Sequence, residues 1–296
     1  MHQEECTPLA VSKRGVMKMA EMLKGEKAII TGSAQGIGKG IALKFAEEGC
    51  DILIVDLDAE KAEQTKKEIL EKNPDVKVAV VASKETGDIT NWENCVNMAN
   101  VAKEELGGCS IVVNNAGLTL DKPIHTLPEG WWNIVLDVVL VGSFNIIKAF
   151  APVMKEGGGG RIWNITSVAG ITGNAAQINY SSAKAGLVGL TKAAARELAD
   201  DNIAVNVVGF GAVWTRLVAP HDDIKIMGQK MSAIKATKGV PPEQMMKMYK
   251  SQTPMTKHRD TCLMPQDVGN FFAAVCSKEA HYLTGQWMIY SGGMAI

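Results

Sequence analysis

The chain has 296 residues, of which 46% are hydrophobic and 21% charged, so it has enough apolar sequence for one large or at most two globular domains and too much for a disordered chain. Its 31 basic and 32 acidic residues leave a net charge of −1, which excludes a strongly basic surface for nucleic acid or an anionic membrane. We therefore expect a small-molecule ligand.

The cysteines and the N-terminal segment bear on where the protein works. The 6 cysteines are scattered, with no C-x-x-C pair and no histidine at ligand spacing, which indicates neither a disulfide framework nor a metal site. Residues 1–26 carry charges throughout and have no uninterrupted apolar stretch, unlike a signal peptide or a membrane span. We expect a soluble cytoplasmic protein whose N-terminal extension either packs as an amphipathic arm, through Val16, Met19, Met22 and Leu23, or is solvated.

From Lys27 onward, short apolar runs alternate with helix-length amphipathic stretches. The runs are KAIIT, DILIV, VKVAVV, IVVNNAG, RIWNITS and IAVNVVG, and the first helices are predicted over residues 37–48, 59–72 and 92–105. Continuous apolar strands joined by helices are typical of a parallel sheet covered on both faces. The pattern predicts a doubly wound α/β fold that forms a single domain over residues 27–296.

Residues 216–264 interrupt this pattern with a segment rich in methionine and lysine. A Pro241–Pro242 break precedes a helix-like stretch over residues 243–249. An insertion of this length is more typical of a lid than of an unstructured loop, so we predict a helical substrate lid.

The first strand runs directly into a glycine-rich turn and then into a helix. Glycines there permit a tight turn and close approach of the backbone to a pyrophosphate, whose charge meets the free N–H groups of the helix. The predicted cofactor-binding residues of this turn are Gly32, Ser33, Gln35, Gly36, Ile37 and Gly38.

Asp56 ends the second apolar run, where a carboxylate can accept hydrogen bonds from the hydroxyls of an adenosine ribose. The same carboxylate would repel a 2′-phosphate, and the turn contains no arginine or lysine to neutralise one. These residues favour NAD over NADP as cofactor. The preference is weaker if Asp56 serves only as a helix N-cap.

Tyr180 and Lys184 stand at positions i and i+4, so on a helix both project from one face. A positive charge near a phenol favours its ionised form, and the phenol can then exchange a proton with an alcohol or a carbonyl oxygen. Ser167 ends the run RIWNITS, where its hydroxyl can bond the same substrate oxygen. Asn114 to Gly117 ends another strand at the same edge of the sheet, where ligands bind in such folds.

Taken together, the motifs TGSAQGIG and NNAG, the set Ser167, Tyr180 and Lys184, and the closing TGQ…GG resemble the short-chain dehydrogenase/reductase family from Leu23 to Ile296. The resemblance implies a Rossmann fold, a nicotinamide cofactor, no metal, and a homotetramer or homodimer. It makes Tyr180 the general acid/base and Ser167 the residue that orients the substrate oxygen. Lys184 would lower the phenol pKa and bind the nicotinamide ribose. The further cofactor contacts that it implies are Ile37, Asp88, Asn115, Ala116, Gly117, Val213 and Thr215.

The chain departs from the family pattern at Val139 and Phe210. Val139 occupies the place of an asparagine that belongs to a proton relay through water to the lysine, so either a backbone carbonyl holds that water or activity is lost. Because Ser167, Tyr180 and Lys184 are retained, we favour an active enzyme. Phe210 replaces the usual proline after the sixth strand and is either core packing or an apolar wall at the nicotinamide.

The substrate prediction depends on the lid, whose methionines and Trp214 offer adaptable apolar surface. We expect oxidation or reduction of a secondary alcohol or ketone on a bulky hydrophobic substrate, with a hydroxysteroid as first choice. One alternative is a 3-oxoacyl thioester, whose phosphates would meet lid lysines such as Lys225, Lys230, Lys235 and Lys238. A sugar or polyol fits a lid poor in amide and acidic side chains less well, and a non-catalytic NAD-binding subunit is the alternative outside enzymes.

Overall fold

The computed structural model describes residues 21–215, 224–226, 229–231, 241–258 and 262–295. A seven-stranded sheet of order β3-β2-β1-β4-β5-β6-β9 crosses the molecule, and every neighbouring pair in it is parallel. Its strands are β1 (Lys27–Thr31), β2 (Asp51–Asp56), β3 (Val78–Ala82), β4 (Ile111–Asn114), β5 (Gly160–Ser167), β6 (Ile203–Phe210) and β9 (Trp287–Tyr290). The predicted doubly wound fold is confirmed.

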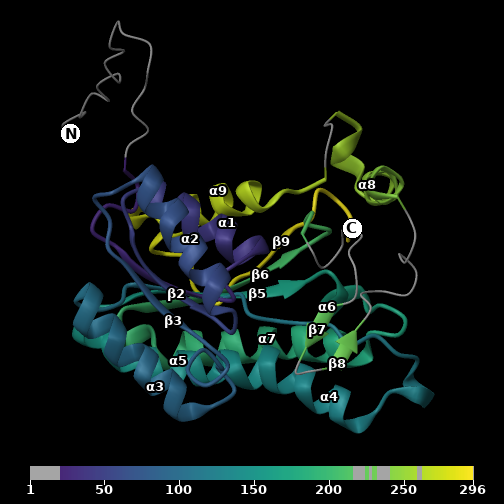
Figure 1. Cartoon of the computed structure of the whole chain (residues 1–296), viewed down its shortest axis with the longest axis horizontal. Helices are drawn as coiled ribbons and strands as arrows, with labels where there is room; N and C mark the ends of the chain where they lie inside the picture. Colours follow the sequence, from purple (N-terminus) through teal and green to yellow (C-terminus); the bar gives the residue numbers. More distant parts are fainter. Residues whose placement is uncertain (1–20, 216–223, 227–228, 232–240, 259–261, 296) are drawn as a thin grey trace, which may run out of the picture.

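Helices cover both faces of this sheet (Figure 1). On one face lie α1 (Gly36–Glu47), α2 (Ala59–Lys72) and α9 (Pro265–Val275); on the other lie α3 (Trp92–Val101), α5 (Gly142–Glu156) and α7 (Ile178–Glu197). The remaining α-helices are α4 (Glu129–Leu136), α6 (Ala169–Thr172) and α8 (Pro242–Ser251). Two π-helical turns extend this set, η1 (Ala102–Leu106) after α3 and η3 (Asp137–Val141) between α4 and α5.

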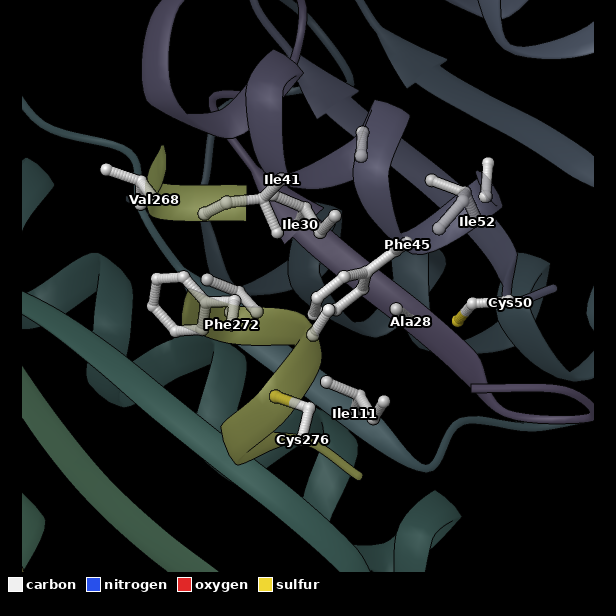
Figure 2. Close-up of a cluster of buried hydrophobic side chains, with 14 of the residues drawn as sticks. Ala28, Ile30, Ile41, Phe45, Cys50, Ile52, Ile111, Val268, Phe272 and Cys276 are labelled. Carbon is white, nitrogen blue, oxygen red and sulfur yellow. The ribbon is translucent and has the colours of Figure 1, made fainter. Parts of the chain in front are cut away.

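The core between the sheet and helices α1, α2 and α9 is filled with apolar side chains. Phe45 of α1 and Phe272 of α9 lie over Ile30 and Ile111 of the sheet (Figure 2), and all of them are fully buried. α1 and α9 approach closely at Gly40, where a methyl group would lie 2.6 Å from the carbonyl oxygen of Pro265. This packing holds the first turn of α1 in a fixed position relative to the sheet.

Phe210 belongs to the core. It is 3% exposed, and its ring centroid lies 6.0 Å from those of Phe271, Phe272 and Tyr290. The contacts with Phe271 and Tyr290 are edge-on and the contact with Phe272 is tilted. Such contacts between aromatic rings are favourable, so core packing accounts for the phenylalanine.

The described part of the N-terminal extension packs on the domain. Leu23 is fully buried, and its backbone N–H donates to the carbonyl oxygen of Glu48 at 3.0 Å. The N–H of Met22 donates to Oε2 of the same glutamate. Val16 and Met19 lie outside the described residues.

The structure adds elements that the apolar runs did not predict. Strand β9 pairs with β6 at the edge of the sheet, and its side chains are half-buried or exposed. Within the predicted lid, β7 (Ile224–Ile226) and β8 (Gln229–Met231) form an antiparallel hairpin. The helix predicted over residues 243–249 is present as α8, while much of the remaining segment lies outside the described residues, including Lys235 and Lys238.

The stretch Glu129–Glu156, which joins α4, η3 and α5, is long and apolar enough to cross a membrane by composition. Half of its most apolar 18-residue segment is buried inside the protein, where α5 packs on α3 and α4 packs on α7. Packing against the sheet and its helices therefore accounts for this apolar composition.

Candidate active site

The predicted site residues gather at the carboxyl edge of the sheet. β1 has β2 on one side and β4 on the other, so the chain changes direction of winding between β1 and β4. The glycine turn follows β1, the NNAG loop follows β4, and Ser167 ends β5. Ligands of doubly wound folds bind at such a switch point.

The glycine turn forms a cradle in which side chains have no room. Gly32 and Gly36 have φ values of 65° and 59°, which favour glycine. A methyl group on Gly38 would lie 2.3 Å from the carbonyl oxygen of Gly32. The first turn of α1 contains no acidic residue, so its positive end is not neutralised within the helix. These features fit the pyrophosphate of a dinucleotide.

Asn115 ties the NNAG loop to this turn. Its Nδ2 donates to the carbonyl oxygens of Thr31 and Gly32, at 2.8 and 3.0 Å. In return, the hydroxyl of Thr31 accepts the backbone N–H groups of Asn115 and Ala116, each at 3.0 Å. The loop after β4 and the turn after β1 are thus one rigid unit. Thr31, the first residue of the motif TGSAQGIG, joins them, a role that the motif alone did not indicate.

Ser33 and Asp56 support the turn from the side of β2. The hydroxyl of Ser33 donates to the carbonyl oxygen of Ile30 at 2.7 Å and accepts the N–H of Val55, so it is used within the protein. Asp56 Oδ2 accepts the N–H of Ala34 at 2.9 Å, next to the turn. The N-cap of α2 is Asp58, and the alternative that Asp56 is only a helix cap is therefore wrong.

The loop before Asp88 lies against Asp56. Gly87 is so close that a methyl group there would lie 1.8 Å from the carbonyl oxygen of Asp56. The loop closes on itself through a bond from Gly87 N–H to the carbonyl oxygen of Ser83 at 2.8 Å. Asp88 Oδ1 accepts the N–H and the hydroxyl of Thr90. The two acids predicted for the adenosine end are brought to one region.

Ser167, Tyr180 and Lys184 come together at the start of α7. The hydroxyl of Tyr180 shares a hydrogen bond with Ser167. Lys184 Nζ lies 5.6 Å from the centre of the Tyr180 ring and donates to the carbonyl oxygen of Ile165 at 2.6 Å. Adjacent Asn179 fixes this helix end, because its Nδ2 donates to the carbonyl oxygens of Leu120 and Trp131.

In the protein side chains alone, the pKa of the Tyr180 phenol lies above its ordinary value, so any lowering by Lys184 is outweighed. Burial raises the pKa of Tyr180 to about 12, although the hydrogen bond with Ser167 opposes it. Burial also lowers the pKa of Lys184 to about 8. Removing both groups from water penalises their charged forms more than their mutual attraction favours them. The spacing places the pair correctly, but the tertiary environment decides its protonation.

The segment after β6 completes the cofactor region. Val213 pairs with Leu263, and the N–H of Trp214 donates to the carbonyl oxygen of Leu263 at 2.8 Å. Thr215 reaches the glycine turn, since a methyl group on Gly36 would lie 3.6 Å from its Cγ2. The structure therefore brings Thr215 to the turn, and Val213 lies two residues before it in the chain.

Val139 stands in a π-helical turn beside Lys184. A methyl group on Gly117 would touch both Val139 Cγ2 and Lys184 Nζ at 3.6 Å. The carbonyl oxygen of Val139 accepts the hydroxyl of Ser143 at 2.7 Å. This carbonyl already has a donor, so a water held there must use its second lone pair. π-turns of this kind are common at functional sites.

A cavity of about 460 Å³ lies between the segment after β6 and α8. Its lining combines apolar and charged side chains: Trp214, Pro242, Glu243, Met246, Lys247 and Lys250. Trp214 directly precedes Thr215 in the cofactor region, so the cavity is the candidate substrate pocket.

Sequence comparisons agree with this geometry. Residues 26–224 match the family model of the short chain dehydrogenase. The 3-oxoacyl-[acyl-carrier-protein] reductase of Aquifex aeolicus (strain VF5) is 34% identical over 276 residues, which cover 92% of this chain and 98% of that protein. The reductase of the same name from Staphylococcus aureus (strain N315) is 35% identical over 272 residues, covering 91% and 98%.

Solved structures share the fold. L-sorbose reductase from Gluconobacter frateurii, complexed with NADPH and L-sorbose, is 26% identical with a TM-score of 0.80, and the match covers 94% of this chain and 98% of that one. The glycine cradle, the Ser167, Tyr180 and Lys184 set and the family match lead to one conclusion. The chain belongs to the short-chain dehydrogenase/reductase family and is an oxidoreductase that uses a nicotinamide cofactor.

Proposed function

We propose that this protein is an NAD(H)-dependent oxidoreductase that interconverts 3-oxoacyl and 3-hydroxyacyl thioesters. The observation that carries the substrate class is the cavity beside Trp214, which is lined by the cations Lys247 and Lys250 together with apolar Trp214, Pro242 and Met246 and one acidic residue, Glu243. An acyl chain needs apolar surface, and the phosphates of a coenzyme A or carrier arm need cations. The names of the relatives at about one-third identity agree with this class.

Three side chains, Ser167, Tyr180 and Lys184, have separate roles in the reaction of the carbonyl group. When bound, the nicotinamide exchanges a hydride with the carbonyl carbon. Tyr180 gives its proton to the carbonyl oxygen in reduction and takes the proton back in oxidation. The hydroxyl of Ser167, held by Tyr180, donates to the same oxygen and fixes its position. Lys184, in its charged form, favours the phenolate that results from reduction.

NAD(H) is proposed over NADP(H) because of Asp56. Its carboxylate stands beside Ala34 of the turn, where it can bond ribose hydroxyls and repels a 2′-phosphate. The related L-sorbose reductase was solved with NADPH, so the preference proposed for this chain rests on Asp56.

A hydroxysteroid, the first choice from the sequence, would use the apolar wall of Trp214 and Met246. It has no group that needs the lysines of the same cavity. The thioester uses both parts of the lining, and we therefore place it first.

The test follows oxidation of NADH and of NADPH with acetoacetyl-CoA, a ketosteroid and a sugar ketone, beside Tyr180→Phe. The proposal expects turnover of the thioester with NADH and none in the variant. Lys247→Gln should raise KM for acetoacetyl-CoA about tenfold, whereas Lys67→Gln on distant α2 should not change it. Turnover of the ketosteroid alone would overturn the thioester assignment, and NADH binding without any turnover would favour a non-catalytic subunit.

We also propose a homo-oligomer. Large apolar side chains remain exposed on η3 and α5, at Val141 and Phe144, and on the edge strand β9, at Trp287 and Ile289. Burying such side chains against a second copy removes apolar area from water. Analytical ultracentrifugation would test this, and a monomer at micromolar concentration would contradict it.

A further inference from the structure

A carboxyl group that the reaction does not use, that of Asp121, is bonded to the end of the helix that presents Tyr180. Asp121 follows the NNAG loop, and its neighbour Leu120 is buried in the apolar cluster against which Tyr180 packs. Gln177 Nε2 donates to Asp121 Oδ2 at 3.0 Å. The other oxygen, Oδ1, is enclosed by protein and has no partner within hydrogen-bond distance among the described residues, although the Thr119 side chain lies near enough to favour the charged form of Asp121. An enclosed carboxylate with one oxygen unpaired exerts its charge on whatever lies next to it.

The segment that carries Asp121 is fastened to the start of α7. Its neighbour Lys122 donates its backbone N–H to the carbonyl oxygen of Ala176 at 2.8 Å. Ala176 has a φ of 66°, a conformation that non-glycine residues rarely adopt without compensation. Asn174 Nδ2 holds Gln177 through its Oε1 at 2.9 Å. Gln177 is the N-cap residue of the helix that presents Tyr180, so the pair is rigidly placed near the phenol.

Within the described part of the chain, few charged groups face the Tyr180 hydroxyl. Lys184 lies on the same helix, 5.6 Å from the ring centre, and Asp121 lies on the loop side. β5 contributes the hydroxyl of Ser167. From α4 and η3 the packing side chains are apolar, and the ammonium of Lys122 is placed over the Trp131 ring, 5.7 Å from its centre. Among the described residues, Asp121 is therefore the negative group opposed to Lys184.

We propose that Asp121 is a positioning residue that sets the proton affinity of the Tyr180 hydroxyl: held by Gln177, its carboxylate opposes ionisation of the phenol and keeps Tyr180 in the acid form that carbonyl reduction requires. A like charge close to an ionising group in a poorly solvated site disfavours the charged form. Reduction begins with a protonated phenol, and oxidation of the alcohol begins with the phenolate. Asp121 thus biases the enzyme toward reduction at neutral pH.

The protonation behaviour of both groups agrees with this geometry. Burial is the main cause that raises the pKa of Tyr180, and the charge of Asp121 adds to it. Burial also raises the pKa of Asp121 above its usual range, while Gln177 and Thr119 favour the charged form. Asp121 is ionised at the alkaline pH where Tyr180 titrates, so its charge acts on the ionisation of the phenol.

The test measures ionisation of Tyr180 directly, in the protein saturated with NAD⁺, from the ultraviolet absorbance of tyrosinate. The chain has 4 tyrosines, and subtracting the curve of Tyr180→Phe isolates the phenol of interest. Asp121→Asn keeps the shape of the side chain and an acceptor for Gln177 but removes the charge. We expect it to lower the titration midpoint by about half to one pH unit. Asp75→Asn, an exposed site on the distant α2–β3 loop, should leave the midpoint unchanged.

A second variant changes the charge in the opposite direction. Gln177→Glu adds a carboxylate next to Asp121 and should raise the midpoint. If Asp121→Asn does not fold, as judged by circular dichroism, Gln177→Glu alone decides: a raised midpoint supports the proposal and an unchanged one overturns it. An unchanged or raised midpoint in folded Asp121→Asn also overturns it. A purely structural role would alter the melting temperature of these variants without moving the midpoints in opposite directions.

Discussion

Lys184 Nζ donates a 2.6 Å hydrogen bond to the carbonyl oxygen of Ile165, and only 4% of the Lys184 surface is exposed. Burial lowers the pKa of this lysine from 10.5 to about 8. A cation in this position loses most of its hydration and regains one carbonyl. Lys184 favours the phenolate of Tyr180, but burial of its charge lowers the stability of the folded protein.

Replacing Lys184 should stabilise the protein while abolishing catalysis. The lysine binds a proton up to pH 10.5 when unfolded and only to about pH 8 when folded, so the stability of the natural protein rises with pH between these values. Below pH 8 the penalty is fully present. We expect Lys184→Met to raise the free energy of unfolding by about 1–3 kcal/mol at pH 7, with the gain vanishing near pH 10.5. Urea unfolding across pH measures this, and a less stable variant at pH 7 would contradict it.

Alanine substitutions at two helical glycines, Gly38 at the glycine turn and Gly189 in α7, form a matched pair. A methyl group on Gly38 in α1 would lie 2.3 Å from the carbonyl oxygen of Gly32, whereas one on Gly189 in α7 meets nothing within 4 Å. Gly38→Ala should displace the turn and weaken NADH binding at least about a hundredfold. Gly189→Ala should leave binding intact and stabilise the protein by about 0.5–1 kcal/mol, the usual gain of alanine over glycine in a helix. Fluorescence titration with NADH and thermal melts distinguish the two variants. Equal NADH affinities would contradict binding of the cofactor pyrophosphate at the glycine turn.

Thr31 is expected to organise the cofactor site through its hydroxyl. It is fully buried, and the hydroxyl accepts the N–H groups of Asn115 and Ala116. Thr31→Val keeps the volume but leaves both donors unpaired, which should destabilise the protein by about 1–3 kcal/mol and weaken NADH binding. Thr31→Ser retains the hydroxyl and should bind NADH as the natural protein does. If the valine and serine variants bind equally, the hydroxyl does not hold the loop.

Asp56 is expected to determine the choice of cofactor. Asp56→Asn removes the charge and keeps an acceptor for the N–H of Ala34, so the ratio of kcat/KM for NADH over NADPH should fall about tenfold. Asp58→Asn serves as the control, because Asp58 caps α2 and asparagine is an equally good N-cap. The control should keep the ratio of the natural protein. An unchanged ratio in Asp56→Asn would mean that other residues exclude the 2′-phosphate.

Much of the fold could be read from local pattern. Continuous apolar runs predicted the buried strands β1 to β6, because parallel strands covered on both faces have no polar side. Edge strand β9 escaped this pattern because it is covered less completely. The hairpin β7–β8 lies in a segment where neither turn signals nor periodicity are strong.

The residues of the candidate site could be identified from local motifs. Motif spacing was sufficient for the glycine turn and for Tyr180 and Lys184, since each set lies within one strand–turn–helix unit or one helix face. How these groups ionise, and which residues surround them, depends on packing between distant parts of the chain. Asp121 and Gln177 are far apart in the chain, and meet only because the loop after β4 is bonded to the start of α7. Protonation depends on burial and on such long-range neighbours, and neither is encoded in the spacing of a motif.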